Sequence, residues 1–204
     1  MTLLLIRHGE TLLNASRTIQ PADTPLSPRG RAQAEALATR LLGSDVQAIV
    51  SSDLPRALET AEAISRLCAL PIIREPLLQE RNFGDLRGRA YDELGFDPLA
   101  MPQAPPGGES EPAFRRRVAE AFAAVLALRS GLDGGLAVVT HGLVIGALLD
   151  AHAQPPEGSA PPARIGNASL TIITAAAPHR VELLNCTVHL DRVAADDARS
   201  LSGG

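Results

Sequence analysis

Short apolar runs alternate with longer amphipathic segments along most of the chain. Apolar runs of strand length occur at residues 2–6, 48–51, 71–73 and 136–140. Apolar positions repeat at helical spacing in residues 28–41, 54–67, 109–130 and 142–152. Strands that alternate with helices predict βαβ units and a mostly parallel sheet. We therefore expect an α/β fold with three layers: helices, sheet and helices.

Local signals set some of the expected helix boundaries. Ser27 followed by Pro28 is typical of an N-cap and a first helical position. For the helix at 54–67, Ser52 or Asp53 stands where an N-cap is expected. The sequence thus predicts where both helices begin.

The last third of the chain departs from the βαβ pattern. Residues 169–174 and 180–184 have the pattern of two strands joined by a Pro-containing turn. Such a hairpin puts at least one antiparallel strand at an edge of the sheet. Residues 153–164 predict a Pro-rich loop and 191–204 a loose tail. Residues 1–204 as a whole predict one domain.

Residues 81–112 are rich in Gly and Pro and show little periodicity. A long irregular stretch inside a compact domain is often a lid or a binding loop. Phe83, Tyr91 and Phe96 give this stretch side chains to bury. We therefore expect a lid at 81–112 and not a disordered linker.

Composition excludes several classes of function. Aromatic residues make up 2% of the 204 residues and Trp is absent, so the core must be mainly aliphatic. The net charge of −4 argues against a nucleic-acid binder, although all 19 basic residues are Arg, which suits bidentate phosphate recognition. Cys68 and Cys186 lie far apart and predict buried free thiols in a reducing cytosol. No apolar run is long enough to span a membrane and the apolar N-terminus is too short for a signal peptide, so we expect a cytoplasmic protein.

Polar side chains follow the predicted strands at the edge where ligands bind in open α/β sheets. Arg7 and His8 follow the first strand and Arg56 comes soon after the second. Glu80 comes after the third and His141 directly after the fourth. Because the carboxyl ends of parallel strands share one edge, we expect these side chains to meet there.

This set of side chains suits phosphoryl transfer. Guanidinium groups bind phosphate oxygens bidentately, one neutral imidazole can attack phosphorus, and a second can donate to the charge of the transition state. A carboxylic acid can protonate the departing oxygen. A metal is the main competitor, but Arg beside a cation is electrostatically adverse and the sequence has no HxxxH or Cys/His cluster. The sequence therefore predicts a site without metal or other cofactor.

The Arg7-His8-Gly9 segment after a Leu-rich strand resembles the signature of the histidine phosphatase superfamily, which includes the cofactor-dependent phosphoglycerate mutases. Further segments are similar in the expected order, from about residue 2 to 190: residues 26–34, 51–57, 78–84, 106–110, 139–142, 167–169 and 184–190. This resemblance implies a three-layer fold and a phosphohistidine intermediate.

By position, the resemblance implies that His8 is the nucleophile and that Glu80 is the general acid, and later the base that activates water. It implies a phosphate pocket made by Arg7, Arg56 and His141.

Other assignments are less direct. The resemblance implies that Asn14 and Arg17 are further phosphate contacts near the mouth. Glu75 is a nearby rival for the role of general acid. Glu109 and Ser110 fit a helix start better than a substrate contact. Gln79, Arg81 and Asn82 depart from the residues that many relatives have, and we expect these departures to alter the leaving-group side of the pocket.

The sequence thus predicts a metal-independent phosphomonoester hydrolase that acts on a small phosphorylated metabolite. A phosphoglycerate mutase is the alternative, although such mutases usually carry an extra basic insertion after the general acid. A non-catalytic phosphate-binding protein would be expected to have lost His8 or Glu80. A sugar phosphate, a phosphoglycerate and an α-ribazole phosphate all remain candidate substrates, and a homodimer remains open.

Overall fold

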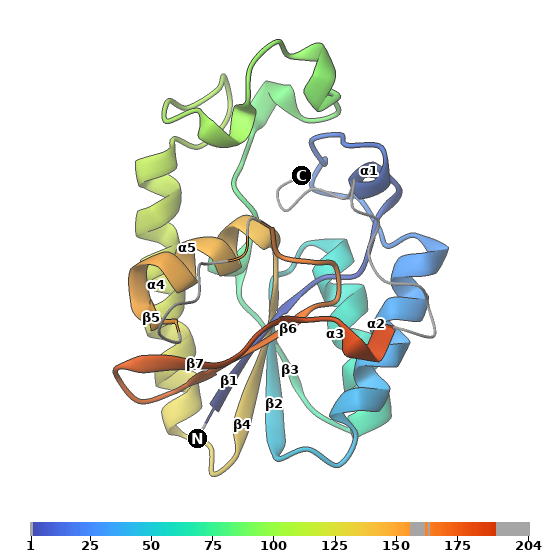
Figure 1. The fold of residues 1–204 in the computed structure, drawn as a ribbon, viewed down its shortest axis with the longest axis vertical. Helices are drawn as coiled ribbons and strands as arrows, with labels where there is room; N and C mark the ends of the chain where they lie inside the picture. Colours follow the sequence, from blue (N-terminus) through green and yellow to red (C-terminus); the bar gives the residue numbers. More distant parts are fainter. Residues whose placement is uncertain (1, 156–161, 163, 191–204) are drawn as a thin grey trace.

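The computed structural model describes residues 2–155, 162 and 164–190. It contains a mixed sheet in the order β3-β2-β4-β1-β6-β7-β5 (Figure 1). The strands are β1 (Thr2–Arg7), β2 (Val46–Ser51), β3 (Ile72–Arg74), β4 (Gly135–Thr140), β5 (Ala153–Gln154), β6 (Leu170–Thr174) and β7 (His179–Cys186). The expected tail at 191–204 and residues 156–161 and 163 of the loop expected at 153–164 lie outside the described residues.

The predicted mostly parallel α/β sheet is confirmed. β1, β2, β3 and β4 run parallel to one another, and β6 is antiparallel to both β1 and β7. The hairpin therefore supplies the antiparallel pairing near one end of the sheet. The two-residue strand β5 lies beyond it and runs parallel to β7.

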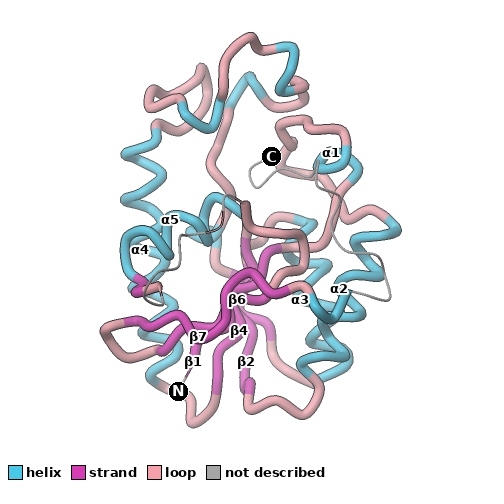
Figure 2. The backbone as a smooth tube through the Cα atoms, viewed as in Figure 1, coloured by secondary structure: helices cyan, strands magenta, loops and turns pink. Residues whose placement is uncertain are grey.

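Helices cover both faces of the sheet, as Figure 2 shows. On one face, α2 (Pro28–Leu41) and α3 (Pro55–Cys68) pack against Leu4 and Ile6 of β1. On the other, α4 (Glu111–Ser130) and α5 (Gly142–His152) pack against Leu3 and Leu5. Successive side chains of a strand point to opposite faces, so a continuous apolar run serves both layers.

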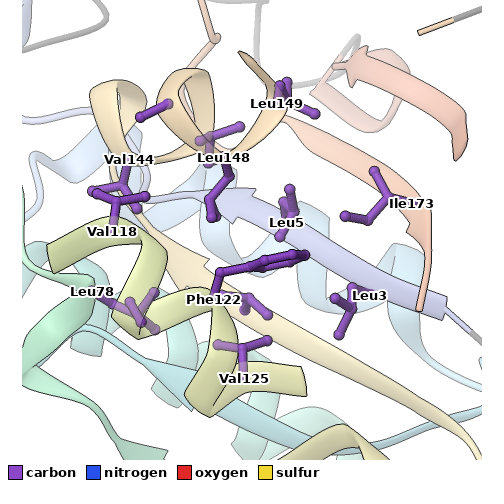
Figure 3. Close-up of a cluster of buried hydrophobic side chains, with 14 of the residues drawn as sticks. Leu3, Leu5, Leu78, Val118, Phe122, Val125, Val144, Leu148, Leu149 and Ile173 are labelled. Carbon is purple, nitrogen blue, oxygen red and sulfur yellow. The ribbon is translucent and has the colours of Figure 1, made fainter. Parts of the chain in front are cut away.

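The core is mainly aliphatic, as the composition requires. Phe122 of α4 lies among Leu3 and Leu5 of β1 and supplies aromatic volume to this cluster (Figure 3). The two cysteines form no disulfide, as expected, but both are partly exposed and not buried.

The expected helix boundaries hold in part. Ser27 caps α2 and accepts a hydrogen bond from the Gly30 N–H. Ser110 caps α4, so the interpretation of this residue as a helix start is confirmed. The expected cap of α3 is wrong, because Leu54 occupies the N-cap position and makes no side-chain cap. The short helix α1 (Leu12–Ala15) was not expected from periodicity.

The segment at 81–112 contains the 3₁₀ turns η2 (Gly84–Leu86), η3 (Tyr91–Glu93) and η4 (Pro98–Ala100). Its backbone is joined to the loop that follows α1. The Ile19 N–H donates to the Arg89 carbonyl across 3.0 Å, the Gly88 N–H to the Ile19 carbonyl across 2.7 Å, and the Tyr91 N–H to the Arg17 carbonyl across 3.0 Å. Two further turns complete the described elements: η1 (Pro76–Leu78) and η5 (Val188–Leu190). In the part of the chain that the structure describes, no helix is both long and apolar enough to cross a membrane.

Candidate active site

The ends of three neighbouring parallel strands bring the predicted side chains together. β4 lies between β1 and β2 in the sheet. Arg7 and His8 are at the end of β1, His141 follows β4 as the N-cap of α5, and Arg56 begins α3 beyond β2. Glu80 follows η1. None of these five side chains is more than 5% exposed.

The backbone and ring of His8 are both fixed by hydrogen bonds. Its carbonyl accepts from the Ala168 N–H at 3.0 Å and from Asn167 Nδ2 at 3.2 Å. Its Nδ1 lies 2.7 Å from the Gly9 carbonyl oxygen. A carbonyl can only accept, so Nδ1 carries the ring proton and Nε2 keeps a free lone pair.

The charge state of His8 suits a nucleophile. Burial lowers the pKa of His8 well below its ordinary value, and the nearby charges of Arg56 and Arg7 lower it further. The imidazole is therefore neutral at neutral pH. The ring centroids of His8 and His141 lie 5.1 Å apart, so two neutral imidazoles face the same space.

Two buried guanidinium groups give this space its positive charge. Burial lowers the pKa of Arg56 to about 10, and this group remains charged at neutral pH. Arg56 Nη1 donates to the Pro21 carbonyl across 3.3 Å, and Arg7 Nη1 donates to the Ile165 carbonyl across 2.5 Å. The Nε of Arg56 is buried with no partner among the described residues. Because a buried donor without a partner is destabilising, such a group indicates a site for an anion.

Ser52 determines how His141 presents its ring. The Ser52 Oγ lies 2.9 Å from His141 Nε2 and accepts the Leu54 N–H at 3.3 Å. Its own hydrogen is available to donate to Nε2, and in that arrangement the ring proton of His141 lies on Nδ1. That Nδ1 is buried and has no partner in the described chain. Burial and the charge of Arg56 lower the pKa of His141 well below its ordinary value.

The carboxylate of Glu80 lies between two backbone amides. Oε1 accepts from the Arg81 N–H at 2.9 Å, and Oε2 accepts from the Leu143 N–H at 3.1 Å, in the first turn of α5. Burial nevertheless raises the pKa of Glu80, and the two amides only partly oppose this effect. Glu75, the rival, instead caps η1 through the Leu77 N–H at 3.0 Å.

Of the two expected outer contacts, only Asn14 is buried at the site. Its Oδ1 accepts from the Thr11 N–H at 3.2 Å and from Asn167 Nδ2 at 3.1 Å, so the amide orientation is fixed. Its Nδ2 is buried without a partner in the described residues. Arg17 has an exposed side chain and a φ of 56°, and its carbonyl accepts from the N–H of Tyr91 in the 81–112 segment.

Sequence reasoning missed three residues near the pocket. Ser52 was interpreted as a helix cap. Gln20 is buried, its Oε1 accepts from the Thr11 hydroxyl at 2.9 Å, and its Nε2 has no partner among the described residues. Tyr91 has its pKa raised, mainly by burial and then by the charge of Glu80. Periodicity carries no signal for such residues, because each depends on contacts distant in sequence.

Two of the residues that depart from the family pattern, Gln79 and Arg81, bond to neighbouring groups of the protein. Gln79 Nε2 donates to Asp53 Oδ1 across 2.7 Å. The Arg81 guanidinium donates to the Met101 carbonyl across 2.6 Å and lies over the Phe83 ring, 5.3 Å from its centroid. Within the described ranges, no group of three or more His, Cys, Asp or Glu side chains is placed to hold a metal ion.

The chain is similar to known proteins along nearly its whole length. The model of the histidine phosphatase superfamily (branch 1) matches residues 3–187. The chain is 33% identical to a probable phosphoglycerate mutase, GpmB, of Yersinia pestis (strain Pestoides F), over 97% of this chain and 98% of the relative.

Solved structures of proteins named as phosphatases are also similar to this chain. A mycobacterial glucosyl-3-phosphoglycerate phosphatase has a TM-score of 0.75 and 29% identity over 91% of this chain and 98% of its own. A putative α-ribazole-5'-P phosphatase from Escherichia coli has a TM-score of 0.76 and 30% identity over 92% and 97%. The relatives thus include proteins named as a mutase and as phosphatases.

Proposed function

Because the chain belongs to branch 1 of the histidine phosphatase superfamily, we propose that it hydrolyses a small phosphomonoester through a phosphohistidine intermediate. The observation that carries this proposal is the hydrogen bond between His8 Nδ1 and the Gly9 carbonyl at 2.7 Å. It leaves the Nε2 lone pair free in a pocket lined by buried cations. A neutral imidazole so oriented is ready to attack an electrophilic phosphorus.

Each step of the reaction has a side chain to perform it. The His8 Nε2 lone pair forms a bond to phosphorus while the bond to the leaving oxygen breaks, and Glu80 gives that oxygen a proton. Arg7, Arg56 and the Nδ1–H of His141 stabilise the charge on the transferring phosphoryl oxygens. Glu80, now ionised, then takes a proton from water, whose oxygen attacks phosphorus as the P–N bond breaks. Phosphate and neutral His8 result.

The pocket itself supports metal independence, because guanidinium groups supply the positive charge that a cation supplies elsewhere. We favour hydrolysis over mutase activity because the segment after Glu80 is Pro-rich and lacks the extra basic insertion that such mutases usually carry. Arg81 is bonded to lid carbonyls and Arg89 lies 3.9 Å from the Glu93 carboxylate. The names of the relatives keep sugar phosphates, phosphoglycerates and α-ribazole phosphate as candidate substrates.

The test of this proposal is to trap the intermediate. Brief incubation of the protein with a ³²P-labelled phosphomonoester, followed by quenching in base, should leave a base-stable, acid-labile label. His8→Ala should remove both the label and turnover, while the far-ultraviolet circular dichroism stays unchanged. His179→Asn, on β7 and away from the pocket, is the matched control and should keep both. Full turnover by His8→Ala would contradict the assignment of the nucleophile.

A further inference from the structure

One arginine outside the pocket binds the backbone of the segment that presents Glu80. Arg117, on α4, donates from Nη1 to the carbonyls of Leu77 and Gln79, each across 2.7 Å. Its Nη2 lies 3.4 Å from the carbonyl of Glu80 itself. The carbonyl between them, that of Leu78, accepts from the Thr140 hydroxyl at 2.7 Å. Side chains of α4 and β4 therefore hold every carbonyl from residue 77 to residue 80.

A carboxylate at the far end of the lid holds that arginine in turn. Glu109 accepts from Arg117 Nε at 3.0 Å and from Nη2 at 2.8 Å, in a two-pronged ion pair. The two side chains are 16% and 20% exposed. Bidentate geometry with little exposure fixes the guanidinium plane far better than a surface ion pair does.

The same pair also closes the base of the lid. The Glu109 N–H donates to the Asn82 carbonyl across 2.7 Å, and Arg81 Nε donates to the Glu109 carbonyl across 3.3 Å. Residues at the two ends of the 81–112 segment thus bond to each other beside Arg117. One connected network of hydrogen bonds and ion pairs therefore positions both the base of the lid and Glu80.

We propose that the Arg117–Glu109 ion pair is a positioning device that places Glu80 for proton transfer to the leaving group. This inference rests on the proposed function, in which Glu80 is the proton donor. Residues 77–80 comprise the end of η1 and the two residues that join it to the lid, with no strand or α-helix to fix them, so their position depends on side-chain partners. A misplacement of about 1 Å in a catalytic group can lower a rate about 100-fold.

A double-mutant cycle separates positioning from general structural support. The first-turnover rate on an alkyl phosphate is measured for wild type, Arg117→Met, Glu80→Gln and the double variant. Arg117→Met should lose about tenfold to 100-fold in the wild-type background and little in the Glu80→Gln background. On p-nitrophenyl phosphate, whose leaving group needs no proton, the first-turnover rate of Arg117→Met should fall much less. Equal losses in both backgrounds, or on both substrates, would overturn the proposal.

Two comparisons make the cycle specific. Arg116 is the neighbouring arginine of α4 and is exposed. Arg116→Met makes the same chemical substitution as Arg117→Met, and it should leave all rates unchanged. If Arg117→Met does not fold, Glu109→Gln takes its place in the cycle, because it removes the ion pair but leaves the donors to the carbonyls.

Hydrogen exchange gives a readout that does not depend on the reaction. Amides in residues 77–83 should exchange faster in Arg117→Met than in Arg116→Met, and unchanged exchange would overturn the proposal. If wild type forms no phosphohistidine, or if Glu80→Gln has no selective effect, the proposed function fails instead. The two failures are therefore distinguishable.

Discussion

Ser52 Oγ lies 2.9 Å from Nε2 of His141, and Nδ1 of the same ring is buried with no partner among the described residues. The Leu54 N–H donates to the Ser52 oxygen, which leaves the hydroxyl hydrogen available to the imidazole, and in that arrangement the ring proton lies on Nδ1. His141 Nδ1 can then donate to a phosphoryl oxygen without any change of tautomer. The serine that resembles a helix cap in the sequence thus acts on a histidine 89 residues away.

Ser52→Ala should therefore lower the rate of phosphoryl transfer by about tenfold, the equivalent of one net hydrogen bond. ¹⁵N spectra of the histidine ring nitrogens should show a mixture of His141 tautomers in place of a single one. Ser51→Ala is the control, because the Ser51 hydroxyl donates only to the Ser52 carbonyl. An unchanged tautomer in Ser52→Ala would contradict this role.

The lowered pKa values of His8 and His141 predict that the fold is less stable in acid. The ordinary pKa of a histidine is 6.5. Below pH 6.5 each of these imidazoles stays neutral in the folded protein, whereas the same histidine takes up a proton in the unfolded chain. The free energy of unfolding should therefore fall between pH 7.5 and pH 5.5, by about 1 kcal/mol for each histidine. Urea unfolding at the two pH values measures this change.

Glu80 acts in the opposite direction, because its raised pKa favours the folded state as the pH falls. The comparison should therefore be made between wild type and the variants His8→Gln and His141→Gln, in which Glu80 is unchanged. Each variant should show a smaller loss of stability in acid than wild type. Parallel pH profiles would mean that neither histidine is held neutral by burial.

The parts of the fold and site that lie in regular structure could be predicted from the sequence. The apolar run that became β1 faces helices on both sides, so it is apolar at every position, and the residues that follow it fall at the ligand-binding edge. His8, Arg56 and His141 could be expected to meet for this reason. Ser27 was a reliable cap because its hydrogen bond is local to the helix it begins.

The remaining parts depend on contacts that no local pattern records. Leu54 stands at the N-cap of α3, whereas Ser52 contacts the ring of His141, 89 residues away in the sequence. Arg117 has the sequence context of an ordinary charged residue on the polar side of a helix, yet it binds carbonyls about 40 residues earlier. Gln20 gives no sequence signal either, since its partner is Thr11 across the α1 loop.

Activity should survive chelation. The transferring phosphoryl group is expected to be neutralised by Arg7 and Arg56, so EDTA should leave the rate unchanged, and vanadate should inhibit because it adopts the five-coordinate geometry of the transition state. Arg56→Met should weaken inhibition by vanadate. Complete loss of activity with EDTA, restored by Zn²⁺ or Mg²⁺, would contradict the proposed pocket.

Phosphatase and mutase activity differ in where the phosphoryl group goes. With 3-phosphoglycerate and a trace of the 2,3-bisphosphate, a mutase forms 2-phosphoglycerate much faster than free phosphate. We expect free phosphate to account for nearly all turnover, measured by ³¹P spectra over time. Rapid formation of 2-phosphoglycerate would reverse the proposed assignment and favour the function named for the Yersinia relative.

The last prediction concerns the proton that Glu80 is expected to give to the leaving group. Its raised pKa keeps more of the carboxyl protonated near neutral pH than in an ordinary glutamate. Such help matters most for a strongly basic alkoxide and little for p-nitrophenolate. Glu80→Gln should therefore lose about 10²- to 10⁴-fold on an alkyl phosphate, and much less with p-nitrophenyl phosphate.

The comparison must be made on the first-turnover burst, because Glu80 is also expected to act as the base when water cleaves the phosphohistidine. A steady-state rate limited by that second step would lose activity with both substrates and hide the difference. Glu75→Gln is the matched control, since the glutamine oxygen can still accept from the Leu77 N–H and cap η1, so neither burst should change. If Glu80 only orders its loop, Glu80→Gln will lower the burst rate by the same factor with both substrates. A selective loss in Glu75→Gln would transfer the role of general acid to that residue.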